Sequence, residues 1–187
     1  MGWDEDALLA IVGLRSPWLD PIAIALSLLG TLPVWLALTL PLGWRLGRRA
    51  LVRLVLLLLL DALLVGVLKA VIARDRPMIG GRLEVPGDGL DGYAFPSGHA
   101  SRSAAAAAYL ATHGRRWLLF APYAAAVAWS RLHIGVHWPT DVLAGLVVGG
   151  VLGVAATRVF RTSAYVALED RFLAGVDRLW ARLRRPA

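Results

Sequence analysis

Long apolar segments constrain this chain more than any other feature. A helix needs about 20 apolar residues to span a bilayer, with a tolerated range of roughly 17 to 25. Five segments reach or approach this length: residues 31–44 (extendable to 46), 51–72, 97–112, 117–129 and 142–159. Lipid offers the backbone no hydrogen bonds, so each segment is predicted to be a helix. The sequence therefore predicts an all-α integral membrane protein, a helical bundle with five full transmembrane helices.

The first 30 residues leave two alternatives open. Residues 1–16 predict a short N-terminal helix, and residues 17–29 form a further apolar stretch that is short for a crossing. This stretch is either a re-entrant or interfacial element or part of a sixth helix. The acidic start lacks the positive region of a secretory signal, so the apolar segments are expected to be retained. We expect residues 1–187 to form a single membrane-embedded domain.

Composition excludes several other classes of protein. The chain has no cysteine, which rules out disulfides, thiolate metal sites and cysteine nucleophiles. Its 58% apolar content exceeds the roughly 45–50% of soluble domains. The net charge of +7 comes mainly from short arginine clusters beside the apolar segments. Such clusters are typical of topology signals, so a nucleic-acid partner is not expected.

The arginine clusters also predict an orientation, because positive charges concentrate on the cytoplasmic side. One predicted face carries the larger set, which comprises Arg45, Arg48, Arg49, Arg53, Arg115, Arg116, Arg158 and Arg161. On the opposite face, Arg82 is outnumbered by Glu84, Asp88 and Asp91. The loop at 78–95 is therefore expected to face away from the cytoplasm, in a multi-pass protein of the plasma or inner membrane.

The tail at 163–187 is predicted to be cytoplasmic and amphipathic. Its apolar residues recur at helical spacing, with arginines between and beyond them: Leu168, Phe172, Val176, Leu179, Trp180 and Leu183. This pattern favours a helix on the membrane surface. A solvated tail with a structural role is the alternative.

Ionisable residues near membrane helices indicate a functional site, and here they gather on the outer face. Three separate segments contribute to it. The first brings Lys69 and Arg76, the second brings Ser97, Gly98 and His99, and the third brings Arg131, His137 and Asp141. Lys69 and Arg76 lie seven residues apart, about two helical turns, so both side chains are expected to face one way near the end of their helix. Two cations can hold phosphate oxygens, and a helix that starts at Ser97 offers N–H groups to an anion. The arrangement predicts a site for a phosphate group.

Two histidines can divide the work of a phosphoryl transfer. We assign the attack on phosphorus to His137 and protonation of the leaving group to His99. Asp141, four residues after His137, would orient its imidazole. The phosphate-binding set is then Lys69, Arg76, Arg131 and the Ser97–Gly98 backbone. No metal and no other cofactor is expected.

Other residues near this face have weaker predictions. His133 is either structural or directed at substrate. Arg74 could pair with Asp75, and either Arg74 or Arg102 could contact substrate. Gly145, Gly149 and Gly153 recur every four residues and predict close helix packing. The glycine-rich loop at 80–92 is expected to form a rim over the site.

The three segments together resemble the motifs of the type 2 phosphatidic acid phosphatases, which are related to the vanadium haloperoxidases. The matching residues are Lys69-x6-Arg76-Pro77, then Pro96-Ser97-Gly98-His99, then Ser130-Arg131-x5-His137-x3-Asp141. All three are present in family order, between residues 69 and 141. The resemblance implies a helical membrane core, an outward-facing site and metal-independent hydrolysis of lipid phosphates or diphosphates.

We therefore predict a lipid phosphatase that acts through a phosphohistidine at the outer membrane face. The substrate classes implied by the resemblance are undecaprenyl diphosphate, phosphatidylglycerol phosphate and phosphatidic acid. The alternative is a non-catalytic protein that binds or transports anionic lipids with the same basic pocket. The sequence leaves the oligomeric state open.

Overall fold

The structure, a computed structural model, describes residues 2–77, 83 and 92–184 and is helical wherever it has regular elements. The N-terminal part holds α1 (Trp3–Val12), α2 (Leu19–Leu29), α3 (Leu32–Leu46) and α4 (Arg48–Ile72). After the loop come α5 (Gly98–Ala111), the short 3-10 helix η1 (Arg115–Leu119), α6 (Phe120–His133), α7 (Pro139–Val159) and α8 (Ser163–Leu183). The predicted all-α class is confirmed. The predicted rim at 80–92 lies outside the described residues, apart from Leu83 and Gly92.

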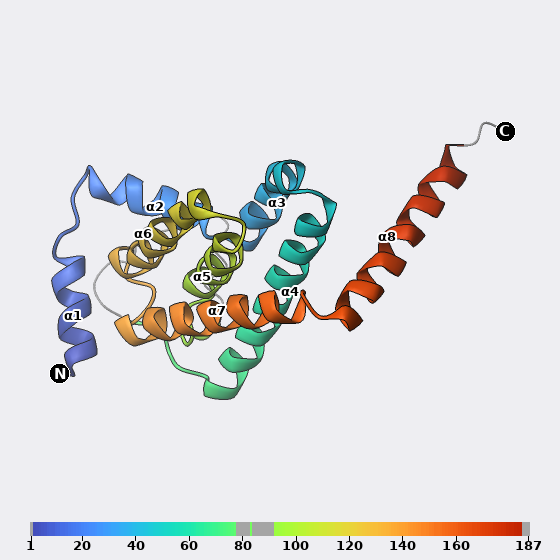
Figure 1. The fold of residues 1–187 in the computed structure, drawn as a ribbon. Coiled ribbons are helices and arrows are strands. Elements are labelled where there is room, and N and C mark those ends of the chain that lie inside the picture. The colour runs from blue at the N-terminus through green and yellow to red at the C-terminus, as the bar shows by residue number, and fades with distance from the viewer. Residues whose placement is uncertain (1, 78–82, 84–91, 185–187) are drawn as a thin grey trace.

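Helix α5 lies at the centre of the bundle, where it contacts α4, α6 and α7 (Figure 1). Nine of its fourteen residues are buried. Its alanine-rich sequence suits this place, because small side chains let neighbouring helices approach closely. Since protein rather than lipid surrounds α5, this helix needs little of the bulky apolar surface of an outer helix.

The predicted number of crossings is confirmed only in part. Two helices, Arg48–Ile72 and Pro139–Val159, are long and apolar enough to cross a membrane. A third candidate is the pair α2 and α3, which are bent by 67° at Gly30. Helices α5 and α6 have fourteen residues each, about 21 Å of helix, so each is shorter than the hydrocarbon core. The count of five full crossings stays a prediction, and the bend keeps both alternatives for residues 17–29 open.

Helices α5 and α7 pack backbone against backbone. A Cβ atom placed on Gly149 would lie 1.8 Å from the carbonyl oxygen of Ser101, and one on Gly145 would lie 2.5 Å from that of Ser97. Gly153 meets Ala105 in the same way, at 2.5 Å. Only glycine fits at these distances, so the predicted glycine packing is confirmed. This contact sets the two helix N-termini side by side.

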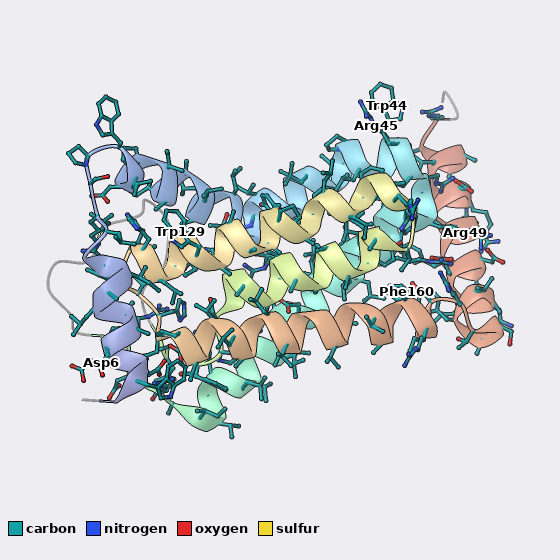
Figure 2. All side chains as sticks on the ribbon, turned by 60° about the vertical axis from the view of Figure 1, so that its left-hand side comes forward. Asp6, Trp44, Arg45, Arg49, Trp129 and Phe160 are labelled. Carbon is teal, nitrogen blue, oxygen red and sulfur yellow. The ribbon has the colours of Figure 1, made fainter. Side chains whose placement is uncertain are left out.

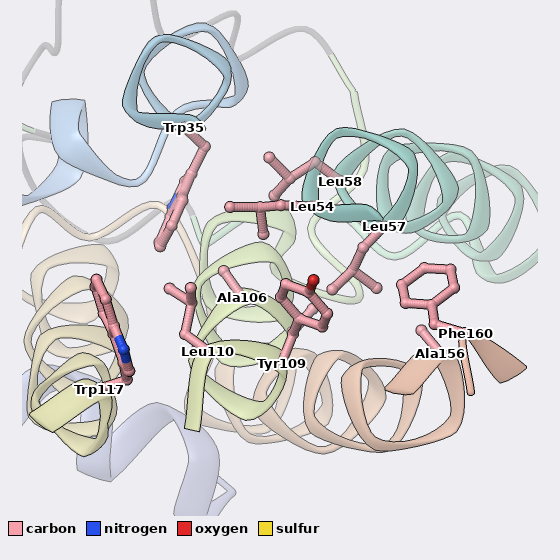
Figure 3. Close-up of a cluster of buried hydrophobic side chains, with 11 residues drawn as sticks. Trp35, Leu54, Leu57, Leu58, Ala106, Tyr109, Leu110, Trp117, Ala156 and Phe160 are labelled. Atoms are coloured by element: carbon pink, nitrogen blue, oxygen red, sulfur yellow. The ribbon is translucent and has the colours of Figure 1, made fainter. Parts of the chain in front are cut away.

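A cluster of large apolar side chains fills one half of the bundle (Figure 3). Its members come from α3, α4, α5, η1 and α7: Trp35, Leu54, Leu57, Leu58, Ala105, Ala106, Tyr109, Leu110, Trp117, Ala156 and Phe160. Near the middle of α5 the cluster meets a polar side chain, because Trp35 Nε1 donates to Ser103 Oγ at 3.3 Å. The apolar cluster thus anchors the helices at the end away from the candidate site.

Two helices lie across opposite ends of the bundle (Figure 2). Helix α1 covers the end where α7 begins, and α8 covers the end where α4 begins. Three residues at the start of α4 form ion pairs with α8: Arg48 with Asp177, Arg49 with Asp170 and Arg53 with Glu169, at 2.6 to 2.9 Å. The predicted helix in the tail is confirmed, and its place on the membrane surface stays a prediction.

The α5–α7 contact gives a first testable prediction. Gly149→Ala would place a methyl group on the Ser101 carbonyl, so the helices must separate. Overpacking of this kind costs about 1–3 kcal/mol. We expect a lower melting temperature of the protein in detergent, measured by the loss of helical circular dichroism.

Gly150→Ala is the matched control, because a Cβ at Gly150 meets no atom within 4 Å. We expect this variant to melt at the temperature of the unchanged protein or slightly above it. Equal melting of the Gly149 and Gly150 variants would contradict the packing argument.

Candidate active site

Three segments that are distant in the sequence meet at the end of the bundle covered by α1. They are the C-terminal end of α4, the N-terminus of α5 and the turn between α6 and α7. A backbone hydrogen bond joins the last two, in which Ser97 N–H donates to the Asp141 carbonyl oxygen at 2.9 Å. The structure therefore brings the three predicted groups of site residues to the same end of the molecule.

Lys69 and Arg76 reach the site from different backbone positions. Helix α4 ends at Ile72, and Ala73 adopts a left-handed conformation with φ of 49°. Lys69 therefore lies in the last helical turn, while Arg76 follows the helix. The prediction that both side chains lie on one helical face is wrong, because the left-handed residue turns the chain between them.

Both cations are held by backbone carbonyl groups. Lys69 Nζ donates to the Tyr93 carbonyl oxygen. Arg76 donates from Nε to the Gly92 carbonyl oxygen at 3.1 Å and from Nη1 to that of Val136 at 2.9 Å. These bonds fasten the segment before α5 and the α6–α7 turn to the end of α4. The carbonyl oxygens orient the two cations and carry no formal negative charge of their own.

The second segment presents the start of α5. Ser97 is fully buried, and its Oγ makes no hydrogen bond to any described residue. Gly98 and His99 open the helix, and the N–H groups of a first turn have no helical carbonyl to bond. Because the Ser97 N–H is held by Asp141, the donors available to an anion are the Ser97 hydroxyl and the first N–H groups of α5.

His137 lies between a cation and a carboxylate. It is 1% exposed, its Nε2 lies 3.4 Å from Arg76 Nη1, and its Nδ1 lies 3.6 Å from Asp141 Oδ2. Asp141 also caps α7, because Oδ2 accepts the Trp138 N–H at 2.8 Å. The two ring nitrogens therefore differ: Nδ1 faces the carboxylate, and Nε2 faces the cations.

The surroundings of His137 favour its neutral form. Burial lowers the pKa of His137 well below its ordinary value, and the charges of Arg131, Arg76 and Lys69 lower it further. His99 is close enough to act on it as well. A neutral imidazole has a free lone pair, which is the form that can attack phosphorus.

Arg131 is completely buried beneath this group. Its Nη1 donates to Ser27 Oγ on α2, and its charge acts on both His99 and His137. A buried cation is expensive unless an anion offsets it. Arg131 therefore places a positive charge where an anion would be favoured.

Several contacts at this end are absent from the sequence predictions. Arg74 pairs with Asp4 and Asp141, at 2.7 Å each, rather than with Asp75. His133 is buried and contacts Asp20 at 2.9 Å, which supports the structural alternative for this residue. No local pattern marks these pairs, because the partners lie 67 to 113 residues apart.

A buried polar pair below the site was also missed. Asp61, on the long helix α4, is 0% exposed and accepts a hydrogen bond from Ser101 Oγ at 2.5 Å. Arg102, predicted as a possible substrate contact, donates from Nη1 to the Gly30 carbonyl oxygen at 3.0 Å. A carboxylate inside an apolar run is the signal that could have identified Asp61.

Across residues 2–77, 83 and 92–184, no group of three or more His, Asp or Glu residues is arranged to hold a metal ion. The residues that meet at the site are instead suited to an anion. Lys69, Arg76 and Arg131 supply charge, and the start of α5 supplies neutral donors. The imidazoles of His99 and His137 lie near these cations.

Fold and site together define a helical membrane protein with buried histidines and cations at one end of its bundle. The chain belongs to the PAP2 superfamily, whose family model matches residues 50–165. The structure resembles the transmembrane PAP2-type phosphatidylglycerolphosphate phosphatase of Bacillus subtilis, with 28% identity, a TM-score of 0.72 and 83% of each chain covered. It also shares the fold of Aquifex aeolicus LpxE, with 24% identity, a TM-score of 0.71, and 84% of this chain and 96% of that one covered.

Sequence relatives match shorter regions. The undecaprenyl-diphosphatase of Sulfolobus acidocaldarius is 34% identical over 84 residues, which is 44% of this chain and 41% of that protein. The lipid A 4'-phosphatase of Bacteroides thetaiotaomicron is 37% identical over 65 residues, 33% of this chain and 29% of that protein. The chain thus aligns with less than half the length of these relatives.

The electrostatic argument gives a second prediction. Arg76→Gln removes the cation nearest to His137 Nε2, so protonation of the ring becomes easier. We expect the pKa of His137 to rise toward the ordinary histidine value of about 6.5. Histidine-selective NMR of labelled protein measures this titration, and the chain has only four histidines to assign.

His113, just beyond the opposite end of α5, is the internal control, because its contacts are to Tyr109 and Thr112. Its chemical shifts should be the same in both proteins under matched conditions. An unchanged His137 titration would refute the assigned influence of Arg76.

Proposed function

We propose that this protein hydrolyses a lipid phosphate monoester or diphosphate through a phosphohistidine intermediate. The observation that carries the proposal is the placement of His137. One ring nitrogen faces Asp141 at 3.6 Å, and the other lies 3.4 Å from Arg76, among the cations that would hold the phosphate. Membership of the PAP2 superfamily supports the same reaction, as does the similarity to an undecaprenyl-diphosphatase and a phosphatidylglycerolphosphate phosphatase.

The first step transfers the phosphoryl group to the enzyme. Nε2 of His137 attacks phosphorus, and the bond between phosphorus and the leaving oxygen of the lipid breaks. His99 donates a proton to that oxygen. Asp141 stabilises the positive charge that develops on the His137 ring. Lys69, Arg76, Arg131, the Ser97 hydroxyl and the Gly98 N–H hold the equatorial oxygens.

The second step releases inorganic phosphate. His99, now neutral, takes a proton from water while the water oxygen attacks phosphorus. The bond between phosphorus and Nε2 breaks, and both histidines return to their starting forms. In both steps, His99 is the residue that donates or accepts the transferred proton.

The substrate class follows from the position of the site at one end of a membrane bundle. A lipid can keep its chains in the bilayer while its phosphate enters between α4, α5 and α7. Undecaprenyl diphosphate, phosphatidylglycerol phosphate and phosphatidic acid all have this form. Undecaprenyl diphosphate and phosphatidylglycerol phosphate are the leading candidates, because two of the similar proteins are named for the hydrolysis of these lipids.

A direct assay tests the reaction. Detergent-purified protein is given isoprenyl diphosphate, phosphatidylglycerol phosphate or phosphatidic acid with a chelator present, and released phosphate is measured. We expect turnover of at least one substrate. His137→Ala should lower it by about 1,000-fold or more, because it removes the nucleophile.

His113→Ala is the matched control, because it removes a histidine far from the site and should keep normal turnover. Lipid binding with no turnover of any substrate would favour the alternative of a binding or transport protein. A phosphorylated residue other than His137, trapped after rapid quenching, would refute the assigned nucleophile.

We further propose that the site faces away from the cytoplasm, with the C-terminus on the cytoplasmic side. The chain has no cysteine, so single cysteines can report sidedness without background. Asp6→Cys lies on the exposed face of α1, and Arg178→Cys lies on the exposed face of α8.

In intact cells, an impermeant maleimide should label the cysteine at position 6. It should label the one at position 178 only after the membrane is opened. The reverse pattern would invert the proposed topology while leaving the reaction unaffected.

A further inference from the structure

The N-terminal helix reaches the candidate site through a single carboxylate. Asp4, on α1, uses both of its oxygens: Oδ1 accepts the Thr140 N–H at 3.0 Å, and Oδ2 accepts the Thr140 hydroxyl at 2.6 Å. Oδ2 also accepts from Arg74 Nη2 at 2.7 Å. Asp4 is thus bound both to the start of α7 and to the segment that follows α4. Its pKa is lowered, because these hydrogen bonds outweigh the opposing effect of its burial.

Arg74 bridges two carboxylates. Its Nη2 contacts Asp4, while Nη1 donates to Asp141 Oδ1 at 2.7 Å and to the Thr140 hydroxyl at 2.5 Å. The guanidinium is planar and holds its donors in a fixed fork, so the position of one carboxylate constrains the other. The face of the Trp138 ring also lies 5.4 Å from its central carbon. Arg74 is therefore held on several sides.

Asp141 divides its oxygens between this bridge and the catalytic histidine. Oδ1 accepts from Arg74, while Oδ2 accepts the Trp138 N–H and lies 3.6 Å from His137 Nδ1. If Asp4 were neutral, Asp141 alone would offset the charge of Arg74. The carboxylate of Asp141 would then be drawn toward Arg74 and away from the imidazole.

We propose that Asp4 is a positioning residue of the active site, which acts through Arg74 and Thr140 to hold Asp141 against His137. This inference rests on the proposed function for its kinetic consequence. It makes α1, which precedes the matched family region at 50–165, a working part of the site.

Other residues before the family region contact the same part of the site. Ser27 holds Arg131, Asp20 contacts His133 Nε2 at 2.9 Å, and Arg15 Nε donates to the His133 carbonyl oxygen at 2.8 Å. These polar contacts tie the first 30 residues to the end of α6, and those of Asp4 tie them to the start of α7. Among the contacts named here, those of Asp4 are the ones that connect to Asp141 through Arg74.

Kinetics of two variants test the inference. Asp4→Asn keeps the size of the side chain and removes its charge, and Thr140→Val removes the bridging hydroxyl. We expect each to lower kcat about tenfold, the size usual for a group that orients another, with KM within about twofold. Asp6→Asn is the matched control, since it makes the same change on an exposed position of α1 and should leave kcat unchanged (Figure 2).

A second readout does not depend on turnover. In this proposal the carboxylate of Asp141 orients the His137 ring, so the ring nitrogen chemical shifts of His137 should move in Asp4→Asn and stay in place in Asp6→Asn. The His113 shifts should stay in place in both. Melting temperatures of the variants, measured in parallel, separate this effect from unfolding.

The outcomes separate the two proposals. Loss of kcat together with moved His137 shifts supports the inference. Unmoved His137 shifts overturn it, because Asp4 would then have only a structural role even if kcat fell. If the unchanged protein turns over no lipid phosphate, the proposed function fails, and the His137 shifts still decide whether Asp4 positions the histidine.

Discussion

The close contact between α5 and α7 determines where the candidate site forms. At Gly149 the two backbones approach so closely that a Cβ would lie 1.8 Å from the Ser101 carbonyl oxygen. This approach allows the Ser97 N–H to bond the Asp141 carbonyl oxygen, which joins the N-terminus of one helix to the first turn of the other. His99 and His137 flank that bond in the sequence. Their placement therefore depends on glycines that carry no chemistry themselves.

The charges gathered at this end explain its chemical preference. Lys69, Arg74, Arg76 and Arg131 are four cations, and Asp4 and Asp141 are two carboxylates. Buried charge of one sign is unfavourable unless it is offset. A phosphate group would be attracted by these cations, whereas a neutral lipid would not. Asp4 and Asp141 both contact Arg74.

The sequence identified the helices and the three motifs because both are local signals. Apolar length indicated the helical segments, and the spacing of residues 69–76, 96–99 and 130–141 identified the site groups. The sequence misplaced Arg76, because the left-handed turn at Ala73 leaves no mark in a chain where alanine is common. It missed the Asp4–Arg74–Asp141 bridge, because charges on a helix surface do not reveal partners 70 residues away. The number of full crossings depends on how far the surrounding helices shield α5 and α6 from lipid. The length of an apolar segment carries no information about this shielding.

The long separation between Asp4 and Thr140 has a consequence for biogenesis. These residues are 136 positions apart, so α1 leaves the ribosome long before its partner exists. At about 5–20 residues per second, the delay is roughly 7 to 27 s. During that time Asp4 must remain in water at the membrane surface, without the partners that later bind it. Closure of the site is therefore a late event in insertion of the chain, because it joins α1 to a helix that is synthesised 136 residues later.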